Sequence, residues 1–166
     1  RQGIEHRSIG QVLSTLLRQA VTVGRRARTE TGIGRNAIST SYAAVELAKR
    51  TVGDLSSSHV LLVGTGKMGE LAAKSLIDKG VAGLAVVGRT SKGTAKLAQE
   101  CGGIVTSCQL EEALPNTDIV ISCTSAPHHV IPREMVEKAM RARSSRPLVL
   151  IDIALPRDVD PAAADL

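Results

Sequence analysis

Residues 60–70, Val-Leu-Leu-Val-Gly-Thr-Gly-Lys-Met-Gly-Glu, constrain the fold of this chain more than any other segment. The apolar half is typical of a buried strand, and a helical pattern begins after three spaced glycines, Gly64, Gly66 and Gly69. In such a turn the glycines allow a tight bend, a close backbone approach to a pyrophosphate, and close packing of helix on strand. Glycine-rich turns are common, so the flanking strand and helix are what favour a phosphate-binding turn here.

Strand and helix patterns alternate from this turn to the end of the chain. Apolar runs predict strands at residues 59–63, 84–87, 104–106, 118–123 and 148–153. Helices are predicted at 66–79, 91–100 and 132–143, with Ser91 as an N-cap, Gly80 as a left-handed C-cap and a weak helical turn at 110–114. This order predicts an α/β fold, a Rossmann-type doubly wound parallel sheet with helices on both faces. Its ligand is expected at the carboxyl edge near the first and fourth strands.

The composition agrees with a buried parallel sheet. The 166 residues include one Tyr and neither Phe nor Trp, so the core must be aliphatic, and aromatic platforms for stacking single-stranded bases are lacking. Three cysteines without CxxC spacing favour neither a disulfide framework nor a zinc site, and they indicate a reducing compartment, the cytoplasm. Neither a membrane span nor a signal peptide is visible in the sequence.

A helical appendage is expected before the sheet. Residues 9–27 have the pattern of an amphipathic helix, residues 31–34 break it, and a second helix is predicted at 38–51. We therefore expect a helical segment at 1–53 and a nucleotide-binding domain at 54–166. Residues 1–50 hold nine Lys or Arg and three Asp or Glu, which indicates either a solvated cationic face or contact with an anionic partner such as RNA.

The predicted turn after the second strand decides which dinucleotide is expected. Domains specific for NAD usually place an acid there, but residues 81–93 contain none. Arg89 can pair bidentately with a 2′-phosphate, Lys92 adds charge, and the hydroxyls of Thr90 and Ser91 lie at a helix start. The sequence therefore predicts NADPH as the cofactor. The expected binding residues are Gly64, Thr65, Gly66, Lys67, Met68, Gly69, Arg89, Thr90, Ser91 and Lys92, with Thr124, Ser125 and Ala126 at the nicotinamide half.

No catalytic residue and no metal site are predicted. Cys123 ends a strand at the expected ligand edge, but no base is placed near it, and free cysteine is commonly a small buried apolar group. The adjacent His128 and His129 would point in different directions on an extended loop. Arg157 either pairs with Asp158 or Asp160 or contacts a substrate; the sequence leaves both readings open.

These motifs together resemble the NADPH-binding domain of the glutamyl-tRNA reductase family, with the end of its catalytic domain and part of its connector in front. The resemblance covers nearly the whole chain. It rests on residues 28–34, 39–48, 64–70, 118–122, 126–127 and 151–161. The Lys67-Met68 pair and the last segment, Ile-Asp-Ile-Ala-Leu-Pro-Arg-Asp-Val-Asp-Pro, are the most selective.

The resemblance implies an NADP-dependent oxidoreductase of tetrapyrrole (porphyrin) synthesis. In this family a cysteine of the catalytic domain attacks glutamyl-tRNA to form a thioester, which hydride from NADPH reduces to glutamate-1-semialdehyde. None of the three cysteines here matches that cysteine's motif. We expect a fragment without the catalytic and dimerisation domains, inactive alone and homodimeric at full length, in the cytoplasm, or in the plastid stroma of a plant.

The chain departs from the family pattern at two places. Gly88 stands where many relatives have Asn, and Lys92-Gly93 replaces a common Glu-Arg, so the phosphate contact of Lys92 rests on chemistry rather than on resemblance. Two alternative functions remain at this point. One is another NADP-dependent reductase, such as a shikimate dehydrogenase-like enzyme. The other is a non-catalytic nucleotide-binding or RNA-binding module.

Overall fold

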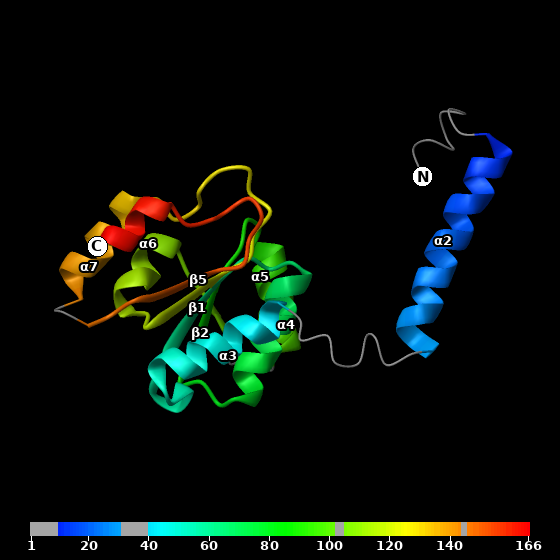
Figure 1. Cartoon of the computed structure of the whole chain (residues 1–166). Helices are drawn as coiled ribbons and strands as arrows, with labels where there is room; N and C mark the ends of the chain where they lie inside the picture. The colour runs from blue at the N-terminus through cyan, green and yellow to red at the C-terminus, as the bar shows by residue number, and fades with distance from the viewer. Residues whose placement is uncertain (1–9, 31–39, 102–104, 144–145) are drawn as a thin grey trace. The chain divides into compact units, whose positions relative to one another are not determined.

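The computed structural model describes residues 10–30, 40–101, 105–143 and 146–166, which fall into two compact units at 1–38 and 39–166 (Figure 1). In the first unit, α2 (Gln11–Glu30) extends the helix expected at 9–27. Its residues Val12, Leu16 and Val21 are exposed. The expected helix break at 31–34 lies outside the described residues.

The second unit contains a five-stranded, fully parallel sheet with the strand order β3-β2-β1-β4-β5. Its strands are β1 (His59–Val63), β2 (Gly83–Val87), β3 (Val105–Ser107), β4 (Ile119–Ser122) and β5 (Val149–Asp152). The order changes direction between β1 and β4, where consecutive crossovers leave on opposite faces. The predicted doubly wound sheet is confirmed, and the edge at which a ligand is expected is formed by the carboxyl ends of β1 and β4.

Helices cover both faces of this sheet. The longer ones are α3 (Thr40–Val52), α4 (Lys67–Asp78), α5 (Ser91–Glu100) and α7 (Arg133–Ala142). The short ones are α6 (Leu110–Ala113) and the 3-10 turns η2 (Leu55–Ser57), η3 (Leu114–Asn116) and η4 (Pro161–Asp165). None of the described helices has the combination of length and apolar character that a membrane span requires.

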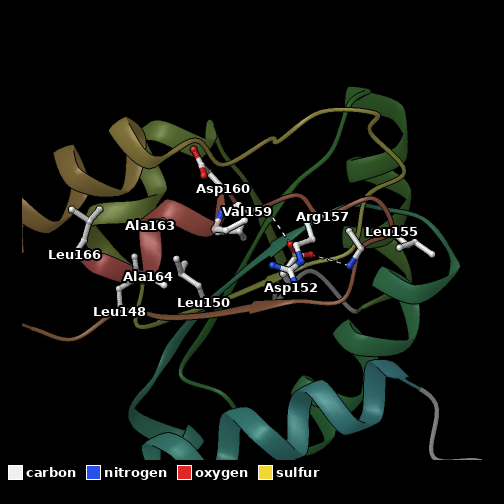
Figure 2. Close-up of a pocket in the computed structure, with 12 residues that line it drawn as sticks. Leu148, Leu150, Asp152, Leu155, Arg157, Val159, Asp160, Ala163, Ala164 and Leu166 are labelled. Carbon is white, nitrogen blue, oxygen red and sulfur yellow. Dashed lines mark hydrogen bonds between the residues drawn. The ribbon is translucent and has the colours of Figure 1, made fainter.

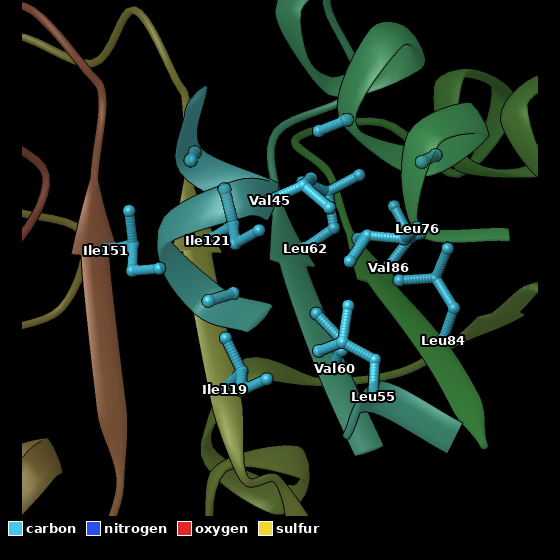
Figure 3. Packing of buried hydrophobic residues seen from close by; sticks show 14 of the residues in the cluster. Val45, Leu55, Val60, Leu62, Leu76, Leu84, Val86, Ile119, Ile121 and Ile151 are labelled. Carbon is cyan, nitrogen blue, oxygen red and sulfur yellow. The ribbon is translucent and has the colours of Figure 1, made fainter. Parts of the chain in front are cut away.

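Alternation along the strands divides the core into two clusters. Val60, Leu62 and Ile121 point toward α3, α4 and α5, as Figure 3 shows for Val45 of α3 and Leu76 of α4. The intervening residues, such as Leu61 and Val63, pack with α7 and η4. Alternate residues of each strand are buried on opposite faces of the sheet, so the strands are continuous apolar runs in the sequence.

The α3 helix belongs to the same compact unit as the sheet, which begins at residue 39 rather than at the expected boundary after residue 53. Its buried Ser41 donates a hydrogen bond to the Met68 carbonyl at 2.8 Å, and its Glu46 pairs with Lys79 at 2.5 Å. Both contacts join α3 to α4. The first turn of α4 is therefore supported from the outside by α3.

Two helix starts differ from expectation. Thr90, not Ser91, is the N-cap of α5, because the extended backbone at Thr90 aims its hydroxyl oxygen at the Gly93 N–H, 3.2 Å away. Pro132 is the N-cap of α7 and lies one residue before its first turn. The expected left-handed cap at Gly80 is confirmed by a φ of +70°.

Candidate functional site

The glycine turn between β1 and α4 is closely packed on one side and open on the other. Gly64 has a φ of +117°, and a Cβ there would lie 2.9 Å from the Cys123 carbonyl oxygen. A Cβ on Gly69 would collide with the Gly64 carbonyl oxygen, so the helix can pack against the strand only without a side chain. A Cβ on Gly66 would meet nothing within 4 Å. Gly66 thus leaves the open side of the turn free for a ligand.

The first turn of α4 offers N–H groups at that open side. Its N-cap, Gly66, has no side chain to occupy them, and helix starts with free N–H groups bind anions. Lys67 is exposed and forms a 3.4 Å ion pair with Glu70. A phosphate at this turn would thus be held mainly by backbone N–H groups, with Lys67 adding positive charge close by.

The turn between β2 and α5 carries the cationic group expected at the 2′-position of the ribose. Arg89, Thr90, Ser91 and Lys92 are all exposed. Neither Arg89 nor Lys92 forms an ion pair with any described residue. The Thr90 oxygen accepts from Gly93, so its hydroxyl hydrogen remains available to an anion. This turn can therefore present a guanidinium, an ammonium and two hydroxyls to one phosphate.

The loop after β4 is held by a buried carboxylate. Asp158 is 0% exposed, and it accepts hydrogen bonds from the Ser122 hydroxyl at 2.5 Å and from the Thr124 N–H at 2.8 Å. The Thr124 hydroxyl donates to its other oxygen at 2.5 Å and accepts from the Ala126 N–H. Thr124 is thus fully engaged within the protein, and it shapes the loop that Ser125 and Ala126 continue.

A second acid folds the segment that delivers Asp158. Asp152, at the end of β5, accepts from the backbone N–H groups of Ala154, Asp158 and Val159 at 2.9–3.0 Å. The described ion pairs include none between Arg157 and Asp158 or Asp160, and Arg157 is exposed. Sequence reasoning considered Asp158 only as one of two possible partners of Arg157, and it missed the hydrogen bonds of Asp158 to Ser122 and Thr124. The signal that could have found them is two acids in a loop that follows a strand at the ligand edge.

Cys123 lies beneath the glycine turn. Its Sγ donates to the Val63 carbonyl at 3.4 Å and to the Gly64 carbonyl at 3.7 Å. Burial, together with the charge of Asp158, raises the pKa of the Cys123 thiol to about 12. Its thiol is protonated at neutral pH, and it packs the turn against β4 instead of acting as a nucleophile.

Alkylation tests this assignment of Cys123. At pH 8 the folded chain is expected to react with iodoacetamide at Cys123 about 30-fold more slowly than the chain unfolded in urea. The thiolate fraction falls by about a thousandfold, and the greater nucleophilicity of a more basic thiolate restores part of the rate. The modified peptides are quantified by mass spectrometry, with the half-buried Cys108 as the internal comparison. Faster labelling of Cys123 than of Cys108 would contradict the assignment.

A cavity of about 550 Å³ lies elsewhere, along β5 and η4 (Figure 2). Leu148, Leu150 and Leu166 line it together with Asp152 and Arg157. None of the thirteen expected cofactor-binding residues contributes to its wall. The cavity is therefore separate from the glycine turn.

Three separate segments of the chain meet at the carboxyl ends of β1, β2 and β4. Gly64 approaches Cys123, and Thr65 approaches Gly88 and Gly93. Neighbouring atoms fill the space of a side chain at Gly64 and Gly69, whereas the space beside Gly66 is open. A pyrophosphate lying along the turn would need that open space. The edge thus combines an open glycine turn with the exposed cations Arg89 and Lys92.

Comparison with known proteins agrees with this geometry. A family model described as shikimate / quinate 5-dehydrogenase matches residues 46–166, which include the whole sheet and the glycine turn. The chain belongs to the shikimate/quinate 5-dehydrogenase family. The match begins inside α3 at Glu46, the residue that pairs with Lys79 at the end of α4.

Curated relatives and solved structures confirm the resemblance to glutamyl-tRNA reductases. The glutamyl-tRNA reductase of Bacillus subtilis is 50% identical over 98% of this chain, and the chain spans 36% of that protein's length. The solved glutamyl-tRNA reductase of Methanopyrus kandleri is 42% identical, with a TM-score of 0.70 over 95% of this chain and 40% of that one. The nucleotide-binding domain of the Thermoplasma volcanium reductase, at 17% identity and a TM-score of 0.55, supports the fold alone.

Proposed function

We propose that this chain is the NADPH-binding part of a cytoplasmic glutamyl-tRNA reductase, which reduces a glutamyl thioester to glutamate-1-semialdehyde in tetrapyrrole synthesis. The observation that carries the proposal is the similarity to glutamyl-tRNA reductases along 98% of the chain, combined with a glycine turn that fits a pyrophosphate. The family model for shikimate / quinate 5-dehydrogenase begins at residue 46, after α2 and the first half of α3, whereas the reductases match these parts too. This favours a glutamyl-tRNA reductase over a shikimate dehydrogenase-like enzyme.

Each bound part of the cofactor has a proposed set of contacts. The backbone of residues 64–69 would hold the pyrophosphate at the start of α4, and Arg89 with Thr90, Ser91 and Lys92 would hold the 2′-phosphate. The loop at 124–126 would lie against the nicotinamide half. NADPH bound in this way supplies hydride, and the protonated Cys123 keeps the turn in place without reacting. The cysteine that forms the thioester would belong to a part of the protein outside this chain.

Removing Arg89 tests the proposed choice of cofactor. Arg89→Ser is expected to raise the Kd for NADPH by about 10–100-fold, because one charge-assisted contact contributes about 1.5–3 kcal/mol. The Kd for NADH should change by less than about twofold, since NADH has no 2′-phosphate for Arg89 to bind. Both constants are measured by fluorescence titration of the reduced dinucleotides.

The matched control is Arg50→Ser, which removes an equally exposed charge at the end of α3 and should alter neither constant. Equal affinity of the unaltered chain for NADPH and NADH would contradict the proposal. So would tight, salt-sensitive binding of tRNA without dinucleotide binding, which is the behaviour of an RNA-binding module. The chain alone is expected not to reduce glutamyl-tRNA, and turnover by these residues would overturn the division of the active site.

A further inference from the structure

Thr65 reaches out of the glycine turn into the neighbouring β2–α5 turn. A Cβ on Gly88 would lie 2.6 Å from Thr65 Cγ2, and a Cβ on Gly93 would lie 2.8 Å from Thr65 Oγ1. Real Cβ atoms do not approach other atoms that closely. The Thr65 side chain therefore occupies space that ordinary side chains at residues 88 and 93 would need.

These two glycines enclose the residues expected to bind the 2′-phosphate. Gly88 follows the last residue of β2, and Gly93 lies in the first turn of α5. The Gly93 N–H is also the group that Thr90 caps, so its position affects the direction of the Thr90 hydroxyl. Thr65 thus contacts both ends of the segment from Arg89 to Lys92.

We propose that Thr65 is a positioning residue that sets the selectivity for NADPH over NADH. The proposal rests on the proposed function, because it assumes that the glycine turn holds the pyrophosphate and that Arg89 holds the 2′-phosphate. Thr65 packs the first of these turns against the second and so fixes the distance between the two phosphate sites. Bidentate contacts to a phosphate lose strength when their groups move by about half an ångström, so this spacing selects the phosphorylated dinucleotide.

A double-mutant cycle of Thr65→Ala and Gly93→Ala tests the packing directly. Gly93→Ala places a methyl group against Thr65 Oγ1, which displaces the segment 89–92, and the ratio of NADH Kd to NADPH Kd should fall at least tenfold. Thr65→Ala removes the Oγ1 and Cγ2 atoms that pack between the two turns, and the ratio should fall about threefold. In the double variant the nearest remaining contacts of the new Cβ are Thr90 Oγ1 at 3.1 Å and the residue 65 Cβ at 3.6 Å. The ratio of NADH Kd to NADPH Kd in the double variant should therefore be no lower than in Thr65→Ala alone.

Gly88→Ala provides a comparison with the same turn. Its Cβ would meet Thr94 Oγ1 at 2.9 Å as well as Thr65, so Thr65→Ala should restore the ratio at Gly93→Ala but not at Gly88→Ala. Gly24→Ala, in α2, serves as the control for a helical glycine, because its Cβ would meet nothing within 4 Å. Circular dichroism of every variant checks that the fold is retained, and Thr65→Ala alone tests the ratio if Gly93→Ala does not fold.

The outcomes separate the two proposals. A preference of the unaltered chain for NADPH, combined with additive losses in the cycle or an unchanged ratio in Thr65→Ala, would overturn the role of Thr65 and leave the cofactor assignment standing. The absence of any preference in the unaltered chain would contradict the cofactor assignment and the role of Thr65 together. Non-additive losses of the Kd ratio, with Thr65→Ala restoring the ratio in Gly93→Ala but not in Gly88→Ala, would support the cofactor assignment and the role of Thr65.

Discussion

Arg143→Met is expected to lower the free energy of unfolding by about 3–5 kcal/mol. The Arg143 side chain is fully buried after α7; its guanidinium donates hydrogen bonds to backbone carbonyls and lies 3.9 Å from the Asp118 carboxylate. Its hydrogen-bond acceptors are the carbonyl oxygens of Leu114, Pro115, Thr117, Arg146 and Pro147. Methionine has a similar length but no donor, so these carbonyls would lose their shared partner in a buried site.

The control for Arg143 is Arg141→Met on the same helix. Arg141 is exposed and pairs with Glu137 at 2.7 Å, four residues earlier. Exposed pairs of this kind contribute less than about 1 kcal/mol, so the control should unfold at nearly the same urea concentration as the unaltered chain. Urea unfolding followed by circular dichroism gives both free energies. Equal losses in the two variants would show that the carbonyl contacts of Arg143 contribute little.

Helical spacing distinguishes Arg143 from Arg141 only by face, because Arg143 follows the buried Val136 and Ala139 by seven and four residues. Both lie at the basic end of an amphipathic helix, where a cation ordinarily faces solvent and interacts with the helix dipole. Arg143 is buried because the η3 turn and its C-cap Thr117, about 28 residues earlier, direct three carbonyl oxygens at its guanidinium. Such a need for donors arises only when α7 and η3 pack together. A pattern within one helix cannot predict it.

The sheet, in contrast, could be predicted almost completely. Each strand of a buried parallel sheet is apolar on both faces, so runs such as Val60–Val63 stand out from the helices between them. The glycine turn was predicted from the spacing of its glycines, and the structure explains two of them, because Gly64 and Gly69 have no room for a side chain. Features that depend on local sequence, such as the cap at Gly80, were also predicted correctly. No predicted strand boundary differs from the observed one by more than one residue.

The parts of the candidate site that the sequence did not predict depend on contacts between distant segments. The contact of Thr65 with Gly88 and Gly93 joins two turns that lie more than twenty residues apart. Ser91 was predicted as the cap of α5, but the neighbouring Thr90 has a hydroxyl too, and its extended backbone makes Thr90 the N-cap. The pairing of Asp158 with β4 spans 36 residues. Local patterns predict which groups reach an edge of the sheet, but not which of them bind one another there.

Asp158→Ala is expected to lower the free energy of unfolding by about 3–4 kcal/mol, comparable to the loss at Arg143. The substitution leaves three donors without an acceptor: the buried Ser122 hydroxyl and both the N–H and the hydroxyl of Thr124. No cation among the described residues pairs with Asp158, so these three hydrogen bonds are what stabilises its buried carboxylate. Asp158→Asn keeps one carbonyl oxygen and should lose about half as much, because its amide nitrogen cannot accept a hydrogen bond.

The control for Asp158 is Asp160→Ala, two residues further along the same segment. The Asp160 side chain caps η4 by accepting from the Ala162 N–H at 2.9 Å, a contact that contributes about 1 kcal/mol. Asp158→Ala should also weaken NADPH binding more than Asp160→Ala does, because only Asp158 holds the loop expected to contact the nicotinamide half. Urea unfolding and NADPH titration of the two variants measure both effects. If the two variants were equally stable, Asp158 would be a local cap like Asp160, and the loop after β4 would need another support.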